Sequence, residues 1–394
     1  MIKIAYVATD PVTAFRLMDG QLGYLRERGF DVTVITAPGK LLDRAASREG
    51  VRCLSVPMTR DISLGRDVLA LWRLTRTLSR LKPDIVNAGT PKAGLLGVIA
   101  ARLAGVPTVV YLLRGLRFEG ARGAKRLVLA ATEHVAAGLA THVFANSRSL
   151  RERFWALGCA ERGKIWVPAD GSSNGVDVER FTPTAESLAW AQSERARYGW
   201  GADEKVVGFV GRFVRDKGLV ELLTAFRVAV LREPRLRLLL VGDHDATDPL
   251  PPEARKHLAS DDRIVVTGFV DEPARYYHLM DVFAFPSVRE GFPNAVLEAA
   301  AAELPVVAFR ATGTIDAVVD GVTGRLIPQG DVASLTEELV RYAMEPPLAR
   351  RQGIAGRQWV EAKFRREVIW KALELQYRRL AGCAQSTQGS RHLP

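Results

Sequence analysis

Short apolar runs rich in β-branched residues alternate with longer stretches of helical period along most of this chain. Such alternation is typical of stacked βαβ units, in which parallel strands are joined by helices that cover the sheet. A first series comprises the runs IKIAYVAT, DVTVIT, DIVNAG, TVVYLL, HVFANS and KIWVPA, and a second comprises VVGFVGR, LRLLLVGD, RIVVTGFV, VFAFPS, PVVAFRA and GRLIPQ. The sequence therefore predicts an α/β protein with two doubly wound, Rossmann-like domains.

The stretch DGSSNGVDVERFTPTAE separates the two series and is rich in the residues that favour turns and linkers. A length of 394 residues is also more than one ordinary core accommodates. We therefore predict a first domain at residues 1–182 and a second at 183–364. Residues 365–394 are expected to form a C-terminal helix that packs back on the first domain and ends in a frayed tail. The aromatic and apolar residues expected to anchor the C-terminal helices are Trp359, Phe364, Trp370 and Leu373.

The positive charge of the chain is confined to its first half. Residues 1–182 hold 27 Lys and Arg against 16 Asp and Glu, whereas the remainder holds 28 of each, so the first half carries the whole net charge of +11. An excess of this kind suits nucleic acid, an anionic membrane surface or a phosphorylated ligand, and a chance bias toward Arg is the alternative. Basic helices such as LWRLTRTLSRLK lack interleaved stacking aromatics, which argues against nucleic acid. The basic residues expected to face a membrane are Arg66, Arg73, Arg76, Arg80, Arg117, Arg122, Lys125 and Arg126.

Other features of the sequence indicate a cytoplasmic protein. The N-terminal run MIKIAYVATD resembles a first strand more than a signal peptide. The most apolar long stretch, LVLAATEHVAAGLATHVFA, carries Glu133 and two histidines, so we expect no transmembrane segment. The three cysteines are scattered, without the spacing of a disulfide framework, zinc site or redox motif. We expect a cytoplasmic protein that can contact the inner face of the cell membrane.

The strongest local signal is VFAFPSVREGFPNAVLEAAAAELPVVAF. It predicts a strand ending at Ser287, a short loop with Glu290 and Gly291, and a helix that starts near Asn294 with Glu298 in its first turns. A helix N-terminus offers free N–H groups and a partial positive charge, which suits a pyrophosphate. Because carboxylates repel phosphate, we assign Glu290 and Glu298 to hydroxyl groups of the same ligand. In the alternative interpretation, Glu298 only complements the helix dipole and Glu290 is a solvated loop acid.

A second signal of the same kind is VVGFVGRFVRDKGLVELLTAF. A strand ends at Gly211 and Arg212, and Lys217 with Gly218 opens an amphipathic helix. The planar guanidinium of Arg212 can bridge two phosphate oxygens while Lys217 adds a compact charge, so the two could neutralise a diphosphate without a metal. Alternatively, both cations are merely solvated. No GxGxxG follows the first strand and no GxxxxGK[ST] occurs, which argues against a dinucleotide oxidoreductase or a P-loop enzyme.

Together these motifs resemble the retaining glycosyltransferases of family 4, which have the two-domain GT-B fold. The resemblance rests on EGFPNAVLE, on the GR…KG motif, and on LLLVGD, VVTGFV, DVFAFPS and GVTGRLIPQGD, and it is looser in the first half, in TPKAGLLGVIAARLAGVP and NGVDVERF. It implies that Arg212 and Lys217 bind the diphosphate of the sugar donor, Glu290 the transferred sugar and Glu298 the ribose. The full set of donor-binding residues that it implies is Gly211, Arg212, Lys217, Val270, Glu290, Gly291, Phe292, Pro293, Asn294, Ala295 and Glu298, with Arg212, Lys217 and Glu290 as the catalytic ones.

The first half departs from the family at two places. Where many relatives have a Gly-Gly pair after the first strand, this chain reads ATDPVTAFRLMDGQL, and where many have a His before a Gly after the fourth strand, it reads LLRG and offers Arg114. An arginine stays charged and cannot shuttle a proton, so Arg114 suits phosphate or acceptor charge, unless it is a buried structural cation. We assign Thr90, Lys92 and Arg114 to the acceptor side.

The resemblance implies transfer of a sugar, with retention, from a nucleotide-diphosphate donor, UDP-linked in our expectation, across a cleft between the domains. The expected acceptor is a glycan or a polyprenyl-diphosphate-linked lipid in polysaccharide, glycolipid or related glycoconjugate biosynthesis. We expect no metal, no other cofactor and no nucleic-acid partner. A sugar-nucleotide epimerase of the same fold is one alternative. A non-catalytic sugar-nucleotide-binding partner within a polysaccharide-assembly complex is the other.

Overall fold

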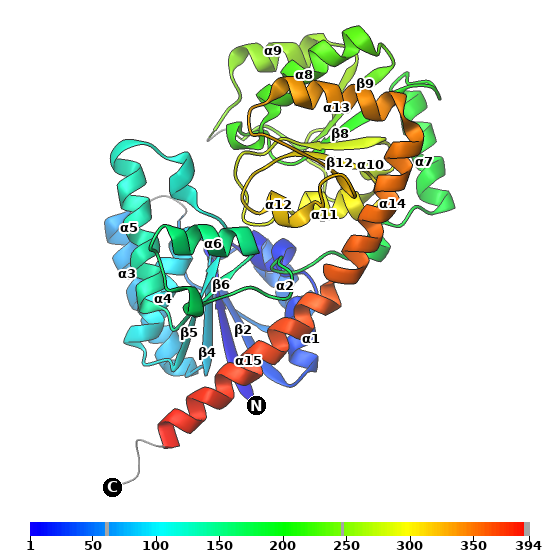
Figure 1. Cartoon of the computed structure of the whole chain (residues 1–394). Helices are drawn as coiled ribbons and strands as arrows, with labels where there is room; N and C mark the ends of the chain where they lie inside the picture. The colour runs from blue at the N-terminus through cyan, green and yellow to red at the C-terminus, as the bar shows by residue number, and fades with distance from the viewer. Residues whose placement is uncertain (60–62, 246–247, 390–394) are drawn as a thin grey trace. The chain divides into compact units, whose positions relative to one another are not determined.

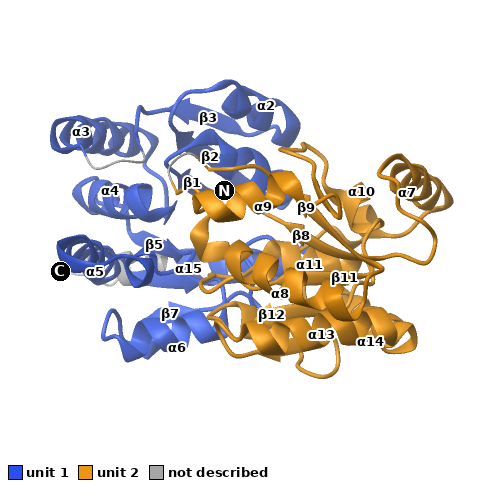
Figure 2. Cartoon of the chain, turned by 90° about the horizontal axis from the view of Figure 1, so that it is seen from above, with its two compact units in different colours: residues 1–175, 366–394 blue, residues 176–365 orange. Residues whose placement is uncertain are grey.

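The computed structural model describes residues 1–59, 63–245 and 248–389. The chain forms two compact units, drawn in different colours in Figure 2. Unit 1 consists of Met1–Gly175 together with the chain from Arg366 onward, and unit 2 consists of Val176–Arg365. The first crossing between units therefore lies at Gly175, inside the Gly- and Ser-rich stretch and seven positions before the boundary placed from the sequence at residue 182.

Unit 1 is built on a parallel sheet with the strand order β3-β2-β1-β4-β5-β6-β7. Its described strands are β1 (Ile2–Val7), β2 (Phe30–Thr36), β3 (Arg52–Ser55), β4 (Ile85–Gly89), β5 (Thr108–Leu113), β6 (His142–Ala145) and β7 (Ile165–Trp166). Six of these correspond to the predicted runs, and β3 is missing from the prediction. Because β3 is an edge strand with Arg52 and Ser55 exposed, its sequence lacks the apolar run that marks the buried strands.

Helices cover both faces of this sheet (Figure 1). The helices of unit 1 are α1 (Gln21–Glu27), α2 (Lys40–Glu49), α3 (Leu64–Leu81), α4 (Pro91–Leu103), α5 (Gly123–Leu139), α6 (Arg148–Ala156) and α15 (Arg366–Gly389). One face packs against α3, α4 and α5, and the other against α1, α2 and α15. Parallel strands buried on both faces give the continuous apolar runs on which the prediction rested.

The last helix, α15, belongs to unit 1. Ile369, Leu373 and Tyr377 are buried in the same cluster as strand residues of β1, β2 and β5. The hydroxyl of Tyr6 on β1 also donates to the hydroxyl of Tyr377, with an O···O distance of 3.1 Å. The helix continues to Gly389, into the stretch expected to be a frayed tail, and residues 390–394 lie outside the described chain.

Unit 2 has a second parallel sheet with the order β10-β9-β8-β11-β12-β13. Its described strands match the six predicted runs: β8 (Lys205–Val210), β9 (Leu236–Val241), β10 (Ile264–Val266), β11 (Val282–Phe285), β12 (Val306–Phe309) and β13 (Gly324–Ile327). Its helices are α7 (Ala185–Arg197), α8 (Leu219–Arg232), α9 (Pro252–Ser260), α10 (Ala274–Tyr277), α11 (Asn294–Ala301), α12 (Thr314–Ala317), α13 (Val332–Met344) and α14 (Pro346–Lys363). The fold is thus α/β with two doubly wound sheets, as predicted. None of the described helices combines the length and the apolar character that crossing a membrane requires.

Candidate functional site

The two strongest sequence motifs meet at one point of unit 2. Strands β8 and β11 are neighbours, and the chain proceeds from β8 to β9 and β10 on one side and from β11 to β12 and β13 on the other. In open parallel sheets, ligands bind outside the carboxyl ends of the strands where the order reverses in this way. The GR…KG motif follows β8 and the EGFPNAVLE motif follows β11, so the topology brings both to this reversal point.

Gly218 allows the two loops to approach each other. Its φ is +70°, in the left-handed region, and a Cβ at this position would lie 1.9 Å from the carbonyl oxygen of Pro286, which directly follows β11. The backbone N–H of Val288 also donates to the carbonyl of Asp216, with an N···O distance of 3.0 Å. Glycine is therefore required for the close contact between the loop after β8 and the loop after β11.

Lys217 and Glu290 form an ion pair across these two loops. Both side chains are largely buried, with 21% of Lys217 and 12% of Glu290 exposed. Glu290 also accepts a hydrogen bond of 2.7 Å from the hydroxyl of Ser287. The carboxylate is thus held from two sides, and the ammonium group keeps donors to spare for a ligand.

Arg212 is placed differently from Lys217. Its side chain is 67% exposed, and its Nη1 donates to the Asp245 carboxylate, which follows β9, at 2.7 Å. A second arginine at the site, Arg289, is paired with Asp216. Asp245 and Asp216 thus each hold an arginine side chain near the strand ends, and Arg212 retains the exposure that a ligand contact needs.

The EGFPNAVLE loop leads into the N-terminus of α11. Gly291, Phe292 and Pro293 are buried, and Asn294 and Ala295 are the first two residues of the helix. Gly313, in the loop after β12, lies against this segment, because a Cβ on Gly313 would come within 2.6 Å of the carbonyl oxygen of Gly291. The backbone amides of the first turn of α11 thus follow a buried loop that packs against Gly313.

Glu298 lies in the second turn of α11 and accepts a hydrogen bond of 2.7 Å from the hydroxyl of Tyr277. Burial, reinforced by the neighbouring carboxylate of Glu298, raises the pKa of Tyr277 well above its ordinary value. The phenol therefore stays protonated and orients the carboxylate. The remaining predicted residue, Val270, is half-buried and follows β10, the edge strand two positions from β8 in the sheet.

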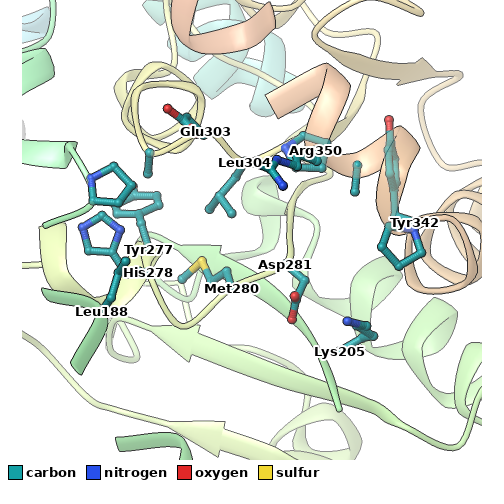
Figure 3. A pocket seen from close by; sticks show the side chains of 15 residues that line it. Leu188, Lys205, Tyr277, His278, Met280, Asp281, Glu303, Leu304, Tyr342 and Arg350 are labelled. Carbon is teal, nitrogen blue, oxygen red and sulfur yellow. The ribbon is translucent and has the colours of Figure 1, made fainter. Parts of the chain in front are cut away.

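A cavity described in unit 2 lies elsewhere. It has a volume of about 270 Å³ and is lined among others by Lys205, Asp281 and Pro305, at or just before the amino ends of β8, β11 and β12 (Figure 3). The predicted sugar-donor residues are absent from its lining. The candidate site is therefore defined by the carboxyl strand ends and not by this cavity.

Unit 1 has a reversal point of its own, between β1 and β4. Thr90 follows β4 with a φ of +69°, uncommon for a residue other than glycine, and its hydroxyl oxygen lies 2.7 Å from that of Thr9, which follows β1. Thr90 precedes α4, so its conformation aims the N-terminus of that helix at the carboxyl edge. Lys92 is turned away toward α3, where its ammonium pairs with Asp67 at 2.7 Å.

Arg114 follows β5 at the same edge. Its Nε atom is enclosed and has no hydrogen-bond partner among the described residues, and burial lowers the pKa of the guanidinium to about 10 despite the opposing influence of Tyr6, Asp10 and Tyr377. Nearby in the sheet, Asn87 of β4 donates from Nδ2 to the Tyr377 hydroxyl at 2.6 Å, while its Oδ1 lacks a partner in the described chain. Arg114 and Asn87 thus each leave one enclosed polar atom without a partner in the described part of unit 1.

Sequence reasoning missed several residues that shape the two edges: Ser287, Asp216, Asp245, Gly313 and Thr9. Ser287 could have been found, because it lies three positions before Glu290 at the end of a predicted strand. Asp245 and Gly313 carry no such signal, since each comes from a different strand end of unit 2 and meets the motif only in the folded sheet.

Comparison with known proteins gives two family matches. The family described as "Glycosyl transferases group 1" matches residues 204–344, and the family described as "Glycosyl transferase 4-like domain" matches residues 19–168. The first range lies in unit 2 and contains the whole candidate site. The second lies in unit 1 and contains Thr90, Lys92 and Arg114.

Full-length relatives agree with these matches. The "Capsular polysaccharide biosynthesis glycosyltransferase CapM" of Staphylococcus aureus is 36% identical over 92% of this chain and 93% of its own length. The "UDP-Gal:alpha-D-GlcNAc-diphosphoundecaprenol alpha-1,3-galactosyltransferase" of Escherichia coli is 30% identical over 86% and 87%. Among solved structures, Anabaena Alr3699/HepE in complex with UDP and glucose has a TM-score of 0.79 at 21% identity, covering 95% of this chain and 99% of that one. Sucrose-phosphate synthase from Thermosynechococcus elongatus has a TM-score of 0.79 at 22% identity, covering 97% and 100%, so the predicted GT-B type of fold is confirmed.

Proposed function

Since this chain belongs to the glycosyl transferases of group 1, we propose that it transfers a sugar, with retention, from a UDP-sugar to a polyprenyl-diphosphate-linked or glycan acceptor. That it is a glycosyltransferase of polysaccharide or related glycoconjugate biosynthesis follows from its relatives. The observation that carries the finer proposal is the Lys217–Glu290 ion pair at the reversal point of unit 2. The pair places a cation suited to a diphosphate next to a carboxylate suited to sugar hydroxyls.

The diphosphate of the sugar donor binds at the N-terminus of α11 in this proposal. The first amides of the helix, at Asn294 and Ala295, offer N–H groups and the positive end of the helix dipole. Lys217 supplies a charge from the opposite loop, and Arg212 has the exposure to swing from Asp245 onto a phosphate oxygen. Together these groups balance an anion that gains charge as it departs.

The two glutamates bind hydroxyl groups. Glu290 is oriented by Lys217 and Ser287, so its remaining lone pairs can accept from hydroxyls of the transferred sugar. Glu298 is oriented by Tyr277 and accepts from the ribose hydroxyls. Gly291, Phe292 and Pro293 line the loop between these two contacts, and Val270 lies toward the base.

The reaction needs no protein nucleophile in this proposal. An acceptor hydroxyl oxygen forms a bond to the anomeric carbon while the bond from that carbon to the diphosphate oxygen breaks. The hydroxyl proton passes to the departing phosphate on the same face of the sugar, so the configuration is retained. The chain contributes positioning and electrostatic stabilisation of the leaving group, through Arg212, Lys217 and Glu290.

The acceptor binds at the carboxyl edge of unit 1. Arg114 is a buried cation without a hydrogen-bond partner for its Nε in the described chain, and Thr90 and the N-terminus of α4 lie at the neighbouring strand end. A diphosphate on the acceptor suits such a group. The name of the E. coli relative, whose acceptor is a diphosphoundecaprenol, supports a lipid-linked acceptor of the same class.

A UDP-sugar as the donor is supported by the UDP-Gal in that name and by the structural neighbour with UDP bound. Metal independence rests on Arg212 and Lys217 as the two cations assigned to the diphosphate. If they suffice, activity survives EDTA. Complete loss on chelation, restored by Mg²⁺ or Mn²⁺, would contradict this part of the proposal.

The experiment that tests the proposed function is a screen of UDP- and GDP-sugars against synthetic polyprenyl-diphosphate-linked sugars, read by mass spectrometry. We expect a product heavier by one hexose or N-acetylhexosamine with a UDP-sugar. Epimerised sugar formed without an acceptor would indicate the epimerase instead. Donor binding without turnover of any acceptor would favour a non-catalytic partner.

A further inference from the structure

The outer side of the helix layer α3, α4 and α5 of unit 1 exposes large apolar side chains. In α3, Leu64, Val68 and Trp72 are 81%, 67% and 55% exposed. Their spacing of four residues places them on one face of the helix, beside the face formed by Ala70, Leu74 and Leu78, which are buried against the sheet. This helix is therefore apolar on two sides, whereas a helix at the surface of a soluble domain ordinarily exposes a polar face.

The neighbouring helices continue the pattern. In α5, Leu127 is 73% exposed, and Val128 and Val135 are also exposed, while Ala136 and Ala137 face the core. Helix α4 packs between α3 and α5 and exposes Leu103 at its end. Figure 2 shows the three helices in a row along one side of unit 1. Exposed apolar residues on consecutive helices form a surface and not isolated positions.

Basic side chains surround these apolar ones. The exposed cations of the three helices and of the residue before α5 are Arg66, Arg76, Arg80, Arg102, Arg122, Lys125 and Arg126. The guanidinium of Arg76 lies 5.4 Å from the centre of the Trp72 ring, so a charged group and an indole share one place on the surface. The basic residues expected from the sequence to face a membrane are mostly found here, although Arg73 is half-buried.

The carboxylates of this layer do not offset the charge. Asp67 of α3 is ion-paired with Lys92, and Glu133 of α5 is buried and accepts a hydrogen bond from Tyr111. Within α3, α4 and α5, all of whose residues are described, no exposed acidic side chain occurs. The ionised side chains exposed on these three helices are therefore all basic.

We propose that the outer side of α3, α4 and α5 docks on the surface of an anionic lipid bilayer. Aliphatic side chains and an indole can enter the boundary between headgroups and acyl chains, while Lys and Arg contact the anionic headgroups. The wide basic rim, with Trp72 as the exposed aromatic of α3, fits lipid better than nucleic acid, for which several stacking aromatics are expected. The inference extends the proposed function, because a lipid-linked acceptor lies in such a bilayer, but the docking itself requires no transfer reaction.

The test is flotation of the full chain with vesicles of phosphatidylglycerol and phosphatidylcholine, or of phosphatidylcholine alone, across a salt series. The first variant is Leu64→Gln, Val68→Gln and Trp72→Gln, and the second is Arg122→Gln, Lys125→Gln and Arg126→Gln. A matched control removes three exposed apolar side chains of unit 2, Val228→Gln, Leu231→Gln and Met344→Gln. Circular dichroism and thermal melting check that each variant is folded.

We expect the wild type and the control to float with anionic vesicles at low salt and much less with neutral ones. The apolar variant should lose at least tenfold in partition at all salt concentrations. The basic variant should lose more than tenfold at low salt, since each basic residue near an anionic surface contributes about fivefold, and should show a weaker salt dependence. Because neither variant changes the candidate site, turnover of a short, water-soluble acceptor should stay at the wild-type level.

Two results would overturn the docking proposal. One is a wild type that ignores anionic vesicles at low salt; if it then forms concentration-dependent dimers that the apolar variant abolishes in sedimentation, the partner is a second copy of the chain. The other is folded variants of both kinds that float like the wild type. Vesicle binding by a chain that transfers no sugar would instead leave the docking intact and refute the proposed function.

Discussion

The ammonium group of Lys217 is ion-paired with the carboxylate of Glu290, which lies 73 positions further along the chain. The pair joins the loops that follow β8 and β11, the two strands at which the order of the unit 2 sheet reverses. Either residue alone could be a solvated loop side chain. Their pairing in a largely buried position, supported by Ser287, makes them one preorganised group at the edge where this class of sheet binds ligands.

Replacing Lys217 by Ala should lower kcat/KM for the sugar donor by ten- to a hundredfold or more. A charge-assisted hydrogen bond to phosphate contributes roughly 1.5–3 kcal/mol, and each 1.4 kcal/mol corresponds to about tenfold in rate. Steady-state kinetics would measure the loss, with Lys256→Ala on the exposed side of α9 as the matched control. Arg212→Ala should act in the same direction. Wild-type kinetics in both Lys217→Ala and Arg212→Ala would remove the two-cation interpretation of the site.

Replacing Gly218 by Ala should destabilise the protein by more than about 2 kcal/mol, because the left-handed φ and the contact with Pro286 both oppose a side chain. Gly138 in α5 is the control, since a Cβ there meets no atom within 4 Å. Gly138→Ala should instead gain about 0.5–1 kcal/mol. Denaturant unfolding compares the two. Equal stability of both variants would mean that the loops after β8 and β11 are not in close contact.

Replacing Arg114 by Met should separate stability from activity. Burial lowers the pKa of the Arg114 guanidinium to about 10, which means that enclosing this cation costs folding free energy. A long apolar side chain in its place should therefore leave the melting temperature unchanged or raise it. Turnover of a diphosphate-linked acceptor should nevertheless fall at least tenfold, whereas the exposed Arg52→Met should change neither quantity. A strongly destabilised Arg114→Met variant would instead identify Arg114 as a structural cation.

Glu133 should make stability depend on pH. Burial raises the pKa of this carboxyl to about 7, against the lowering effect of its hydrogen bond from Tyr111. The folded state therefore holds the proton more tightly than the unfolded state, and this contribution to stability is present below about pH 4.5 and is lost as the pH rises toward 7. Glu133→Gln should gain stability relative to the wild type over that window, on the order of 3 kcal/mol at the upper limit. Melting temperatures measured from pH 5 to 8 test this. A difference between the two proteins that stays the same at every pH would contradict the raised pKa.

The sequence predicted most of the fold because parallel strands covered on both faces produce uninterrupted apolar runs. The twelve predicted runs correspond to strands of the two sheets. Strand β3 was missed because it lies at the sheet edge and spans only four residues, of which the two end residues are exposed and the two middle ones half-buried. The boundary between the units lies before the predicted residue 182, because Val176 already pairs with Arg365 within unit 2. The residues around Val176 have the composition of a linker, so nothing in the sequence indicates this pairing.

The site was predictable where its residues are close in sequence. Glu290, Asn294 and Glu298 follow one strand, and Lys217 precedes one helix, so each motif carries its own local signal. The partners of these residues were not predictable, because Asp245 and Gly313 come from other strand ends and Tyr277 from α10. Lys92 was assigned from the sequence to the acceptor side, but its ammonium pairs with Asp67. That ion pair depends on the packing of α4 against α3, which the sequence does not reveal.

The most direct test of the central claim follows the anomeric proton by NMR during transfer from a UDP-α-sugar to a polyprenyl-diphosphate-linked acceptor, with wild type and Lys217→Ala compared. The account predicts an α-linked product as the first one formed, present with EDTA and reduced at least tenfold in the variant. A β-linked first product would contradict retention, and equal product from the two proteins would contradict the assignment of the Lys217–Glu290 pair to the sugar donor.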